Sequence, residues 1–131
     1  MALGDKQAAV AALPLGGKRI LVVEDQAFIA LEMQDYLERA GAAVAGPVGR
    51  LDRAVKSAGE EHLDAAVLDI DLNGERCWPV ADVLALRAIP FAFTTGFEAS
   101  IVVPERFKDA PLLSKPYREK AVVSVLWKLL G

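Results

Sequence analysis

Short apolar runs alternate with longer amphipathic segments from Lys18 to the end of the chain, and this alternation constrains the fold more than any other feature. A short apolar run suits a strand that is buried on both faces of a sheet, and an amphipathic segment suits a helix that covers one face. Strands that alternate with helices are typical of βα units around a parallel sheet. The strands are expected at 19–23, 42–48, 65–69, 90–94 and 112–114.

Four segments have the spacing of amphipathic helices, and a fifth is interrupted. The first helix is expected to have Asp25 as its N-cap and to stop at Gly41. The interval 96–110 has Pro104 in its middle, so its helix should be short, broken or displaced. The other helices are expected at 51–60, at 79–88 and after Pro116.

These elements predict an α/β fold of (βα)5 type, doubly wound and flavodoxin-like, with a parallel five-stranded sheet of order 2-1-3-4-5 and a reduced or displaced fourth helix. A length of 131 residues is that of one domain. We expect residues 1–17 to be a flexible leader and residues 18–131 to form the domain. That domain would fill the chain to its last helix and leave no room for a separate output domain.

Composition excludes several classes of protein. The single Cys77 rules out a disulfide scaffold and a zinc site built on cysteines, which makes the cytoplasm the default location. The formal charge of −3, with scattered basic residues, argues against nucleic-acid binding. The longest stretch without charged residues, 7–17, is about half of the ~20 apolar residues that a membrane helix needs. A secretory signal is not expected either.

Polar residues that could carry chemistry lie at the ends of the expected strands, where doubly wound sheets bind ligands. Glu24 and Asp25 follow the first strand, and Asp69 ends the third. Thr95 follows the fourth strand and Lys115 follows the fifth. Clustered carboxylates repel one another and persist most easily around a hard divalent cation such as Mg²⁺. With a lysine for an anion and a hydroxyl donor, the set indicates phosphoryl transfer onto Asp69 as the nucleophile.

Four separated motifs agree with one family in identity, order and strand placement: Val-Val-Glu24-Asp25, Val-Leu-Asp69, Thr95-Gly96 and Lys115-Pro116. In combination they resemble the receiver domains of two-component response regulators, over residues 19–130. The resemblance implies that Asp69 accepts a phosphoryl group from a sensor histidine kinase or a histidine phosphotransfer protein. It also implies that Thr95 binds a phosphoryl oxygen and that Lys115 pairs with the phosphate.

The resemblance extends to the metal and to one peptide bond. It implies Mg²⁺ held by Asp25, Asp69 and the backbone carbonyl of Asp71, with Glu24 acting through water. It implies a cis peptide bond before Pro116, which only X-Pro bonds allow at modest cost. Thr94 and Thr95 compete for the hydroxyl role, and Thr95 is favoured because a small glycine follows it as in the family.

Two departures from the family concern the switch. Leu112 stands where the family usually has the aromatic residue that turns inward on phosphorylation, so the usual switch is in doubt. The segment 90–97 resembles the divergent receivers named for a Phe-Ala-Thr-Gly signature, imperfectly, because Thr94 replaces the alanine. Phe97 is either a buried anchor or an exposed aromatic that reports the Thr95 loop.

Three functions remain open at this stage. The first is a stand-alone receiver that catalyses only its own phosphorylation and dephosphorylation and signals to a downstream protein, as a monomer or weak dimer. The second is a pseudo-receiver that binds partners without phosphorylation. The third is a haloacid-dehalogenase-type phosphohydrolase with Asp69 and Asp71 as nucleophile and general acid, although that signature belongs on the first strand of its family.

Overall fold

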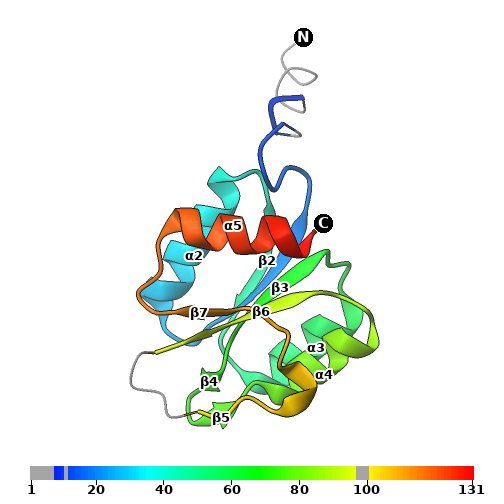
Figure 1. Cartoon of the computed structure of the whole chain (residues 1–131), viewed down its shortest axis with the longest axis vertical. Coiled ribbons are helices and arrows are strands. Elements are labelled where there is room, and N and C mark those ends of the chain that lie inside the picture. Colours follow the sequence, from blue (N-terminus) through cyan, green and yellow to red (C-terminus); the bar gives the residue numbers. More distant parts are fainter. Residues whose placement is uncertain (1–7, 11, 97–100) are drawn as a thin grey trace.

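The computed structural model describes residues 8–10, 12–96 and 101–131. Its main sheet has five parallel strands in the order β2-β1-β3-β6-β7, which is the predicted order 2-1-3-4-5 with two short strands inserted in the numbering (Figure 1). The strands are β1 (Arg19–Val23), β2 (Ala43–Val48), β3 (Ala65–Asp69), β6 (Phe91–Thr95) and β7 (Leu112–Ser114). The predicted doubly wound α/β fold is therefore confirmed.

Helices cover both faces of this sheet (Figure 1). α2 (Ala27–Arg39) and α5 (Glu119–Leu129) pack together on one face, and α3 (Leu51–Glu60) and α4 (Trp78–Leu86) pack together on the other. Successive side chains of β1 alternate between the two cores, since Ile20 joins the α2/α5 side and Leu21 the α3/α4 side. All five residues of β3 are buried, as a strand covered on both faces requires. None of the helices described is long and apolar enough to cross a membrane.

The connection between β6 and β7 differs from the other crossovers. Within its described residues it contains only a single turn of 3-10 helix, η1 (Glu105–Phe107), which follows Pro104. The expected reduction of the fourth helix is therefore confirmed for these residues. The buried ring of Phe107 packs this connection against the α3/α4 core. Its centroid lies 5.8 Å from that of Phe93 and 6.0 Å from that of Trp78.

A small hairpin that the sequence reading did not predict follows β3. β4 (Asp71–Leu72) and β5 (Glu75–Arg76) pair antiparallel across a two-residue loop. The loop residues Asn73 and Gly74 have φ values of 53° and 87°. Two positive φ values in succession are typical of a type I′ turn, for which Asn-Gly is the preferred pair. The hairpin holds the segment after Asp69 in a fixed shape beside the strand ends.

Residues 13–17, which the sequence reading assigned to a flexible leader, pack against the domain. Leu15 is fully buried in the α2/α5 core, and its backbone N–H donates to the carbonyl of Ala40 at 2.9 Å. A Cβ added to Gly41, whose φ is 99°, would lie 2.9 Å from the Cα of Gly16, so the two backbones touch. Residues 13–17 thus pack against the end of α2. The side chain of Leu15 fills part of the core, and the glycine beside it allows the two backbones to approach closely.

We expect Leu15→Ala to lower the free energy of unfolding by about 2 to 3 kcal/mol. This is the lower part of the range for a buried leucine, because Leu15 lies near the edge of the core, where neighbours can close part of the cavity. Urea denaturation measures the change. Leu13→Ala is the matched control, since Leu13 is 40% exposed and should cost well under half as much. Equal effects of the two substitutions would contradict the packing of Leu15.

Candidate functional site

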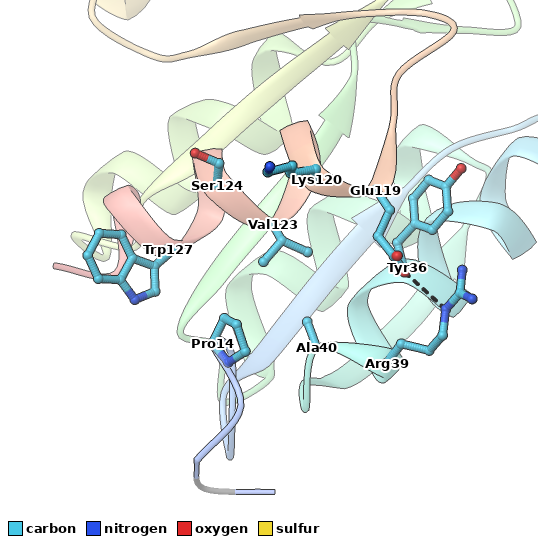
Figure 2. Close-up of a pocket in the computed structure, with 9 residues that line it drawn as sticks. All are labelled: Pro14, Tyr36, Arg39, Ala40, Glu119, Lys120, Val123, Ser124 and Trp127. Atoms are coloured by element: carbon cyan, nitrogen blue, oxygen red, sulfur yellow. Dashed lines mark ion pairs between the residues drawn. The ribbon is translucent and has the colours of Figure 1, made fainter.

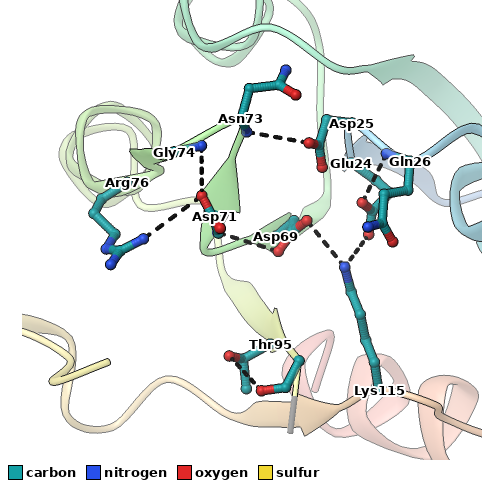
Figure 3. A network of polar contacts seen from close by, with 11 residues as sticks. Glu24, Asp25, Gln26, Asp69, Asp71, Asn73, Gly74, Arg76, Thr95 and Lys115 are labelled. Atoms are coloured by element: carbon teal, nitrogen blue, oxygen red, sulfur yellow. Dashed lines mark hydrogen bonds and ion pairs between the residues drawn. The ribbon is translucent and has the colours of Figure 1, made fainter. Parts of the chain in front are cut away.

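The predicted site residues converge at the carboxyl edge of the sheet. A cavity of about 540 Å³ opens there, between the ends of β1, β3, β6 and β7 (Figure 3). Among the described residues, its lining is mostly polar: Asp25, Gln26, Asp69, Asp71, Asn73, Arg76, Thr95, Gly96, Ile101 and Lys115. Glu24 lies behind this lining, buried beside Lys115. We call this cavity the crevice.

Lys115 joins two buried carboxylates. Its Nζ atom lies 2.7 Å from Oε1 of Glu24 and 3.0 Å from Oδ2 of Asp69 (Figure 3). The side chains of Glu24 and Asp69 are only 4% and 5% exposed. Buried carboxylates are tolerated when a cation pairs with them, so Lys115 balances part of the negative charge of the crevice.

The environment of Asp69 changes its acidity. Burial and the neighbouring Glu24 together raise the pKa of Asp69 to about 7, although Lys115 acts to lower it. The pKa of Lys115 is also raised, because its contacts with Glu24 and Asp69 outweigh the burial that lowers it. A carboxyl with so high a pKa holds its charge at neutral pH more easily when further positive charge is present.

We expect Asp69 of the metal-free protein to titrate near pH 7. Because the folded-state pKa lies above the ordinary value of 3.8, the native chain holds a proton that the unfolded chain releases between these values. The free energy of unfolding should therefore fall as the pH rises through this window. Carboxyl-carbon NMR measures the midpoint, and Glu24→Gln should lower it. A wild-type midpoint near 4 would contradict the expectation.

Three carboxylates are placed to bind one cation. Glu24, Asp25 and Asp69 each offer an oxygen, and these oxygens lie within 4.8 Å of one another. Hard oxygen donors of this kind suit Mg²⁺, which keeps several waters beside one or two carboxylates. The raised pKa of Asp69 is the second sign of fit, because a divalent cation would stabilise its charged form. The crevice can therefore hold Mg²⁺, with Asp25 at its exposed side and Glu24 buried.

Asp25 is not the N-cap that the sequence reading predicted. Gln26 occupies that position, with no side-chain hydrogen bond to the helix. Instead, the Oδ2 atom of Asp25 accepts a hydrogen bond from the backbone N–H of Asn73 at 3.2 Å (Figure 3). The backbone N–H of Gln26 donates to Oε2 of Glu24 at 3.1 Å. The carboxylate of Asp25 thus accepts a hydrogen bond from the hairpin and does not cap the helix α2.

Asp71 turns its carboxylate away from the other acids. Its Oδ1 atom accepts a hydrogen bond from the N–H of Gly74 at 2.8 Å and lies 3.6 Å from Nη1 of Arg76. Its own backbone N–H donates to Oδ1 of Asp69 at 3.2 Å. The backbone of Asp71 is therefore tied to Asp69, and the side chain is engaged within the hairpin.

Of the two threonines, Thr95 reaches the crevice. Thr94 is buried within the sheet, whereas Thr95 is partly exposed and lines the cavity. The hydroxyl of Thr95 donates to the carbonyl of Gly96 at 3.3 Å (Figure 3). Neighbouring residues of a strand point to opposite faces, which explains why only one of them is available.

The remaining predicted residues have mixed outcomes. The peptide bond between Lys115 and Pro116 is cis, so that expectation is confirmed. Leu112, at the position of the usual switch aromatic, is 51% exposed on β7. Phe97 lies outside the described residues, so both interpretations of it stay open. Sequence reasoning missed Arg76 and Asn73 as members of the crevice, although the Asn-Gly pair signals a turn that would bring both back toward Asp69.

A second cavity of about 540 Å³ lies between α2 and α5, away from the strand ends (Figure 2). Pro14 and Trp127 border it at one side, and an ion pair of 3.0 Å between Arg39 and Glu119 crosses it at the other. Its lining is mostly apolar and includes none of the predicted site residues. The crevice, with its converging charges, is the candidate site.

Known proteins resemble this chain in both fold and sequence, although no protein-family model matches it. The solution structure of SdrG from Sphingomonas melonis has a TM-score of 0.77 and 39% identity, over 87% of this chain and 97% of SdrG. The chemotaxis protein CheY of Thermotoga maritima is 27% identical over 123 residues, which cover 86% of this chain and 98% of CheY. Both matches span nearly the whole of the similar protein.

The phyllosphere-induced regulator PhyR of Methylorubrum extorquens is 30% identical over 114 residues, or 85% of this chain. The matched part is only 43% of the length of PhyR. A doubly wound domain with three acids and a lysine at its strand ends defines a signalling module of receiver type. The similar proteins agree with this class, and the chain belongs to the response regulator receiver domains. Receiver domains are in general signalling modules without a metabolic reaction of their own.

Proposed function

We propose that the chain is a stand-alone response regulator that accepts a phosphoryl group on Asp69, in the cytoplasm, and signals through contacts with another protein. The donor is the phosphohistidine of a sensor histidine kinase or of a phosphotransfer protein. One observation carries the proposal: the ammonium of Lys115 lies 3.0 Å from the buried carboxylate of Asp69, beside an acidic cluster that suits Mg²⁺. A structure of SdrG in a BeF3-activated conformation, 38% identical to this chain, adds support.

The proposed reaction needs a nucleophile, charge neutralisation and an oriented phosphoryl group. An Asp69 oxygen forms a bond to phosphorus while the bond from phosphorus to the donor nitrogen breaks and that nitrogen keeps the electron pair. Lys115 is placed to exchange its contact with Asp69 for one with a phosphoryl oxygen. The hydroxyl of Thr95 can turn from the carbonyl of Gly96 and donate its hydrogen bond to a phosphoryl oxygen instead. Asp25 and Asp69 would hold Mg²⁺, which when bound would supply further neutralisation of the transferring group.

Hydrolysis of the acyl phosphate would return the domain to its resting state. Water attacks phosphorus, the bond to the Asp69 oxygen breaks, and the carboxylate and inorganic phosphate are released. The domain therefore catalyses its own phosphorylation and dephosphorylation and nothing else. The haloacid-dehalogenase alternative loses its support, because Asp71 directs its carboxylate to Gly74 and Arg76 and because Asp69 ends β3, not β1.

The partner surface we propose lies beside the crevice on α2. Phe28 and Leu31 are 89% and 60% exposed and follow Asp25 by about one and two turns of helix. Exposed apolar side chains next to a charged site suit the docking of a protein that delivers or reads the phosphoryl group. We also propose membership of the divergent subgroup with a Phe-Ala-Thr-Gly signature, supported by the 3-10 turn that replaces the fourth helix.

Phosphorylation of Asp69 can be tested with a small phosphodonor. Wild-type protein incubated with Mg²⁺ and acetyl phosphate should gain one phosphoryl group, and Asp69→Asn should gain none, because the amide is not a nucleophile of comparable strength. Intact-mass spectrometry measures the gain. Asp109→Asn is the control, since Asp109 is exposed and lies outside the crevice lining. If the wild type gains nothing from acetyl phosphate, phosphoramidate or any kinase, the phosphorylation-independent pseudo-receiver replaces the proposal.

A further inference from the structure

Arg76 is the cation of the crevice to which neither the sequence reading nor the proposed reaction assigns a role. It is the last residue of β5, and its side chain lines the crevice together with Asp69, Thr95 and Lys115. In Figure 3 its guanidinium points toward Asp71, and Asp69 lies between it and Lys115. In this view the two cations thus lie on different sides of the phosphoacceptor, Lys115 in contact with it and Arg76 in contact with Asp71.

The backbone of Arg76 is fixed, whereas its side chain is held weakly. The hairpin is anchored by the hydrogen bond from Asn73 to Asp25 and by one of 2.9 Å from the N–H of Cys77 to the carbonyl of Ile70. The guanidinium has only a long ion pair of 3.6 Å with Asp71, and the two side chains are 45% and 55% exposed. Such exposed pairs contribute little, so an anion in the crevice can compete for the guanidinium.

The negative charge of the crevice is a reason why a second cation would help an anionic phosphodonor to bind. Lys115 is already shared between Glu24 and Asp69, which are both buried. A phosphodonor carries about two negative charges and must approach these carboxylates. Of the described residues that line the crevice, Arg76 is the cation that is not in contact with Asp69. A guanidinium binds phosphate oxygens in a planar, two-point geometry that a lysine cannot provide.

We propose that Arg76 leaves Asp71 to bind the oxygens of the incoming phosphodonor and holds its phosphorus in line with Asp69. This role rests on the proposed function. With acetyl phosphate, the Asp69 oxygen forms the bond to phosphorus while the bond from phosphorus to the acetate oxygen breaks and acetate leaves with the electron pair. No proton or further reactant is needed. Arg76 touches the donor and takes no part in bond making.

The test compares Arg76→Gln with wild type under Mg²⁺ and acetyl phosphate, by the initial rate of phosphoryl incorporation. We expect a rate roughly threefold to tenfold lower, since attraction between charges raises association rates by this order or more. The deficit should shrink in high salt, which screens charges, and should be smaller with phosphoramidate, which carries less negative charge. Arg76→Lys should recover part of the rate, because it keeps the charge without the planar geometry.

Arg50→Gln is the matched control, because Arg50 also pairs with an aspartate, Asp52 at 3.3 Å, but lies outside the crevice lining. It should leave the rate unchanged, and Mg²⁺ affinity, followed by tryptophan fluorescence, should be no weaker in Arg76→Gln. An unchanged rate in Arg76→Gln, a deficit independent of salt, or an equal deficit in Arg50→Gln would overturn the inference. In each of these outcomes the wild type still gains a phosphoryl group. If the proposed function itself were wrong, the wild type would gain none.

Discussion

Replacing Lys115 with methionine should abolish most phosphoryl incorporation and lower the free energy of unfolding at pH 8 by about 3 to 5 kcal/mol. The substitution keeps the aliphatic length but removes the ammonium that lies 2.7 Å from Glu24 and 3.0 Å from Asp69. Two buried carboxylates would then face each other without a protein cation. Removal of one partner of a buried pair costs more than the pair contributes, since the other charge stays buried.

The pH dependence separates this mechanism from a simple loss of packing. The pKa of Asp69 is already raised to about 7 by burial and by Glu24, and loss of Lys115 would raise it further. A carboxyl with a raised pKa can protonate, so the destabilisation of Lys115→Met should be much smaller at pH 5 than at pH 8. Added Mg²⁺ should restore part of the stability at pH 8.

Urea denaturation at the two pH values measures both effects. Lys108→Met is the matched control, because Lys108 pairs with Glu105 at 3.2 Å on the surface, where the two side chains are 63% and 85% exposed. That substitution should change the free energy of unfolding by less than about 0.5 kcal/mol at either pH. A loss in Lys115→Met that is equal at pH 5 and pH 8 would mean that packing, and not charge, explains it.

The strands and their order were predictable because a strand that is buried on both faces has a short, continuous run of apolar residues. The apolar runs at 19–23 and 65–69 are long enough for a strand and too short for a helix, and the structure places them at the centre of the sheet. Once the order was known, the strand ends gave Asp69 and Lys115, because parallel strands bring their carboxyl ends to one edge. The interruption at Pro104 predicted the reduced fourth helix on local grounds alone.

What local patterns could not reveal depends on contacts between distant residues. Leu15 stands alone among small residues, and its burial follows only from the meeting with Ala40 and Gly41. Asp25 has the local pattern of an N-cap, because it follows a strand and precedes a helix. Its carboxylate instead binds the backbone of Asn73, which is 48 positions away in the sequence. The turn at Asn73 was different, since the Asn-Gly pair is itself a local signal for a two-residue hairpin turn.

The largest loss of stability from an apolar substitution is expected at Phe93, which is fully buried at the centre of an aromatic cluster. Its ring centroid lies 5.3 Å from that of Phe91, 5.5 Å from that of Trp78 and 5.8 Å from that of Phe107, with the rings edge to face. Phe93→Ala removes these contacts and leaves a cavity under α4 and η1. We expect the free energy of unfolding to fall by about 3 to 5 kcal/mol.

The cluster also links this core to the connection between β6 and β7, because Phe107 is the buried residue of η1. We therefore expect Phe93→Ala to loosen η1 before the sheet, seen as faster hydrogen exchange at the N–H of Phe107, which donates to the carbonyl of Pro104 at 2.9 Å. Phe28→Ala is the control, since Phe28 is 89% exposed and should change stability by less than about 0.5 kcal/mol. A loss below about 1 kcal/mol in Phe93→Ala would show that the cluster closes around the cavity, and unchanged exchange at Phe107 would separate η1 from the core.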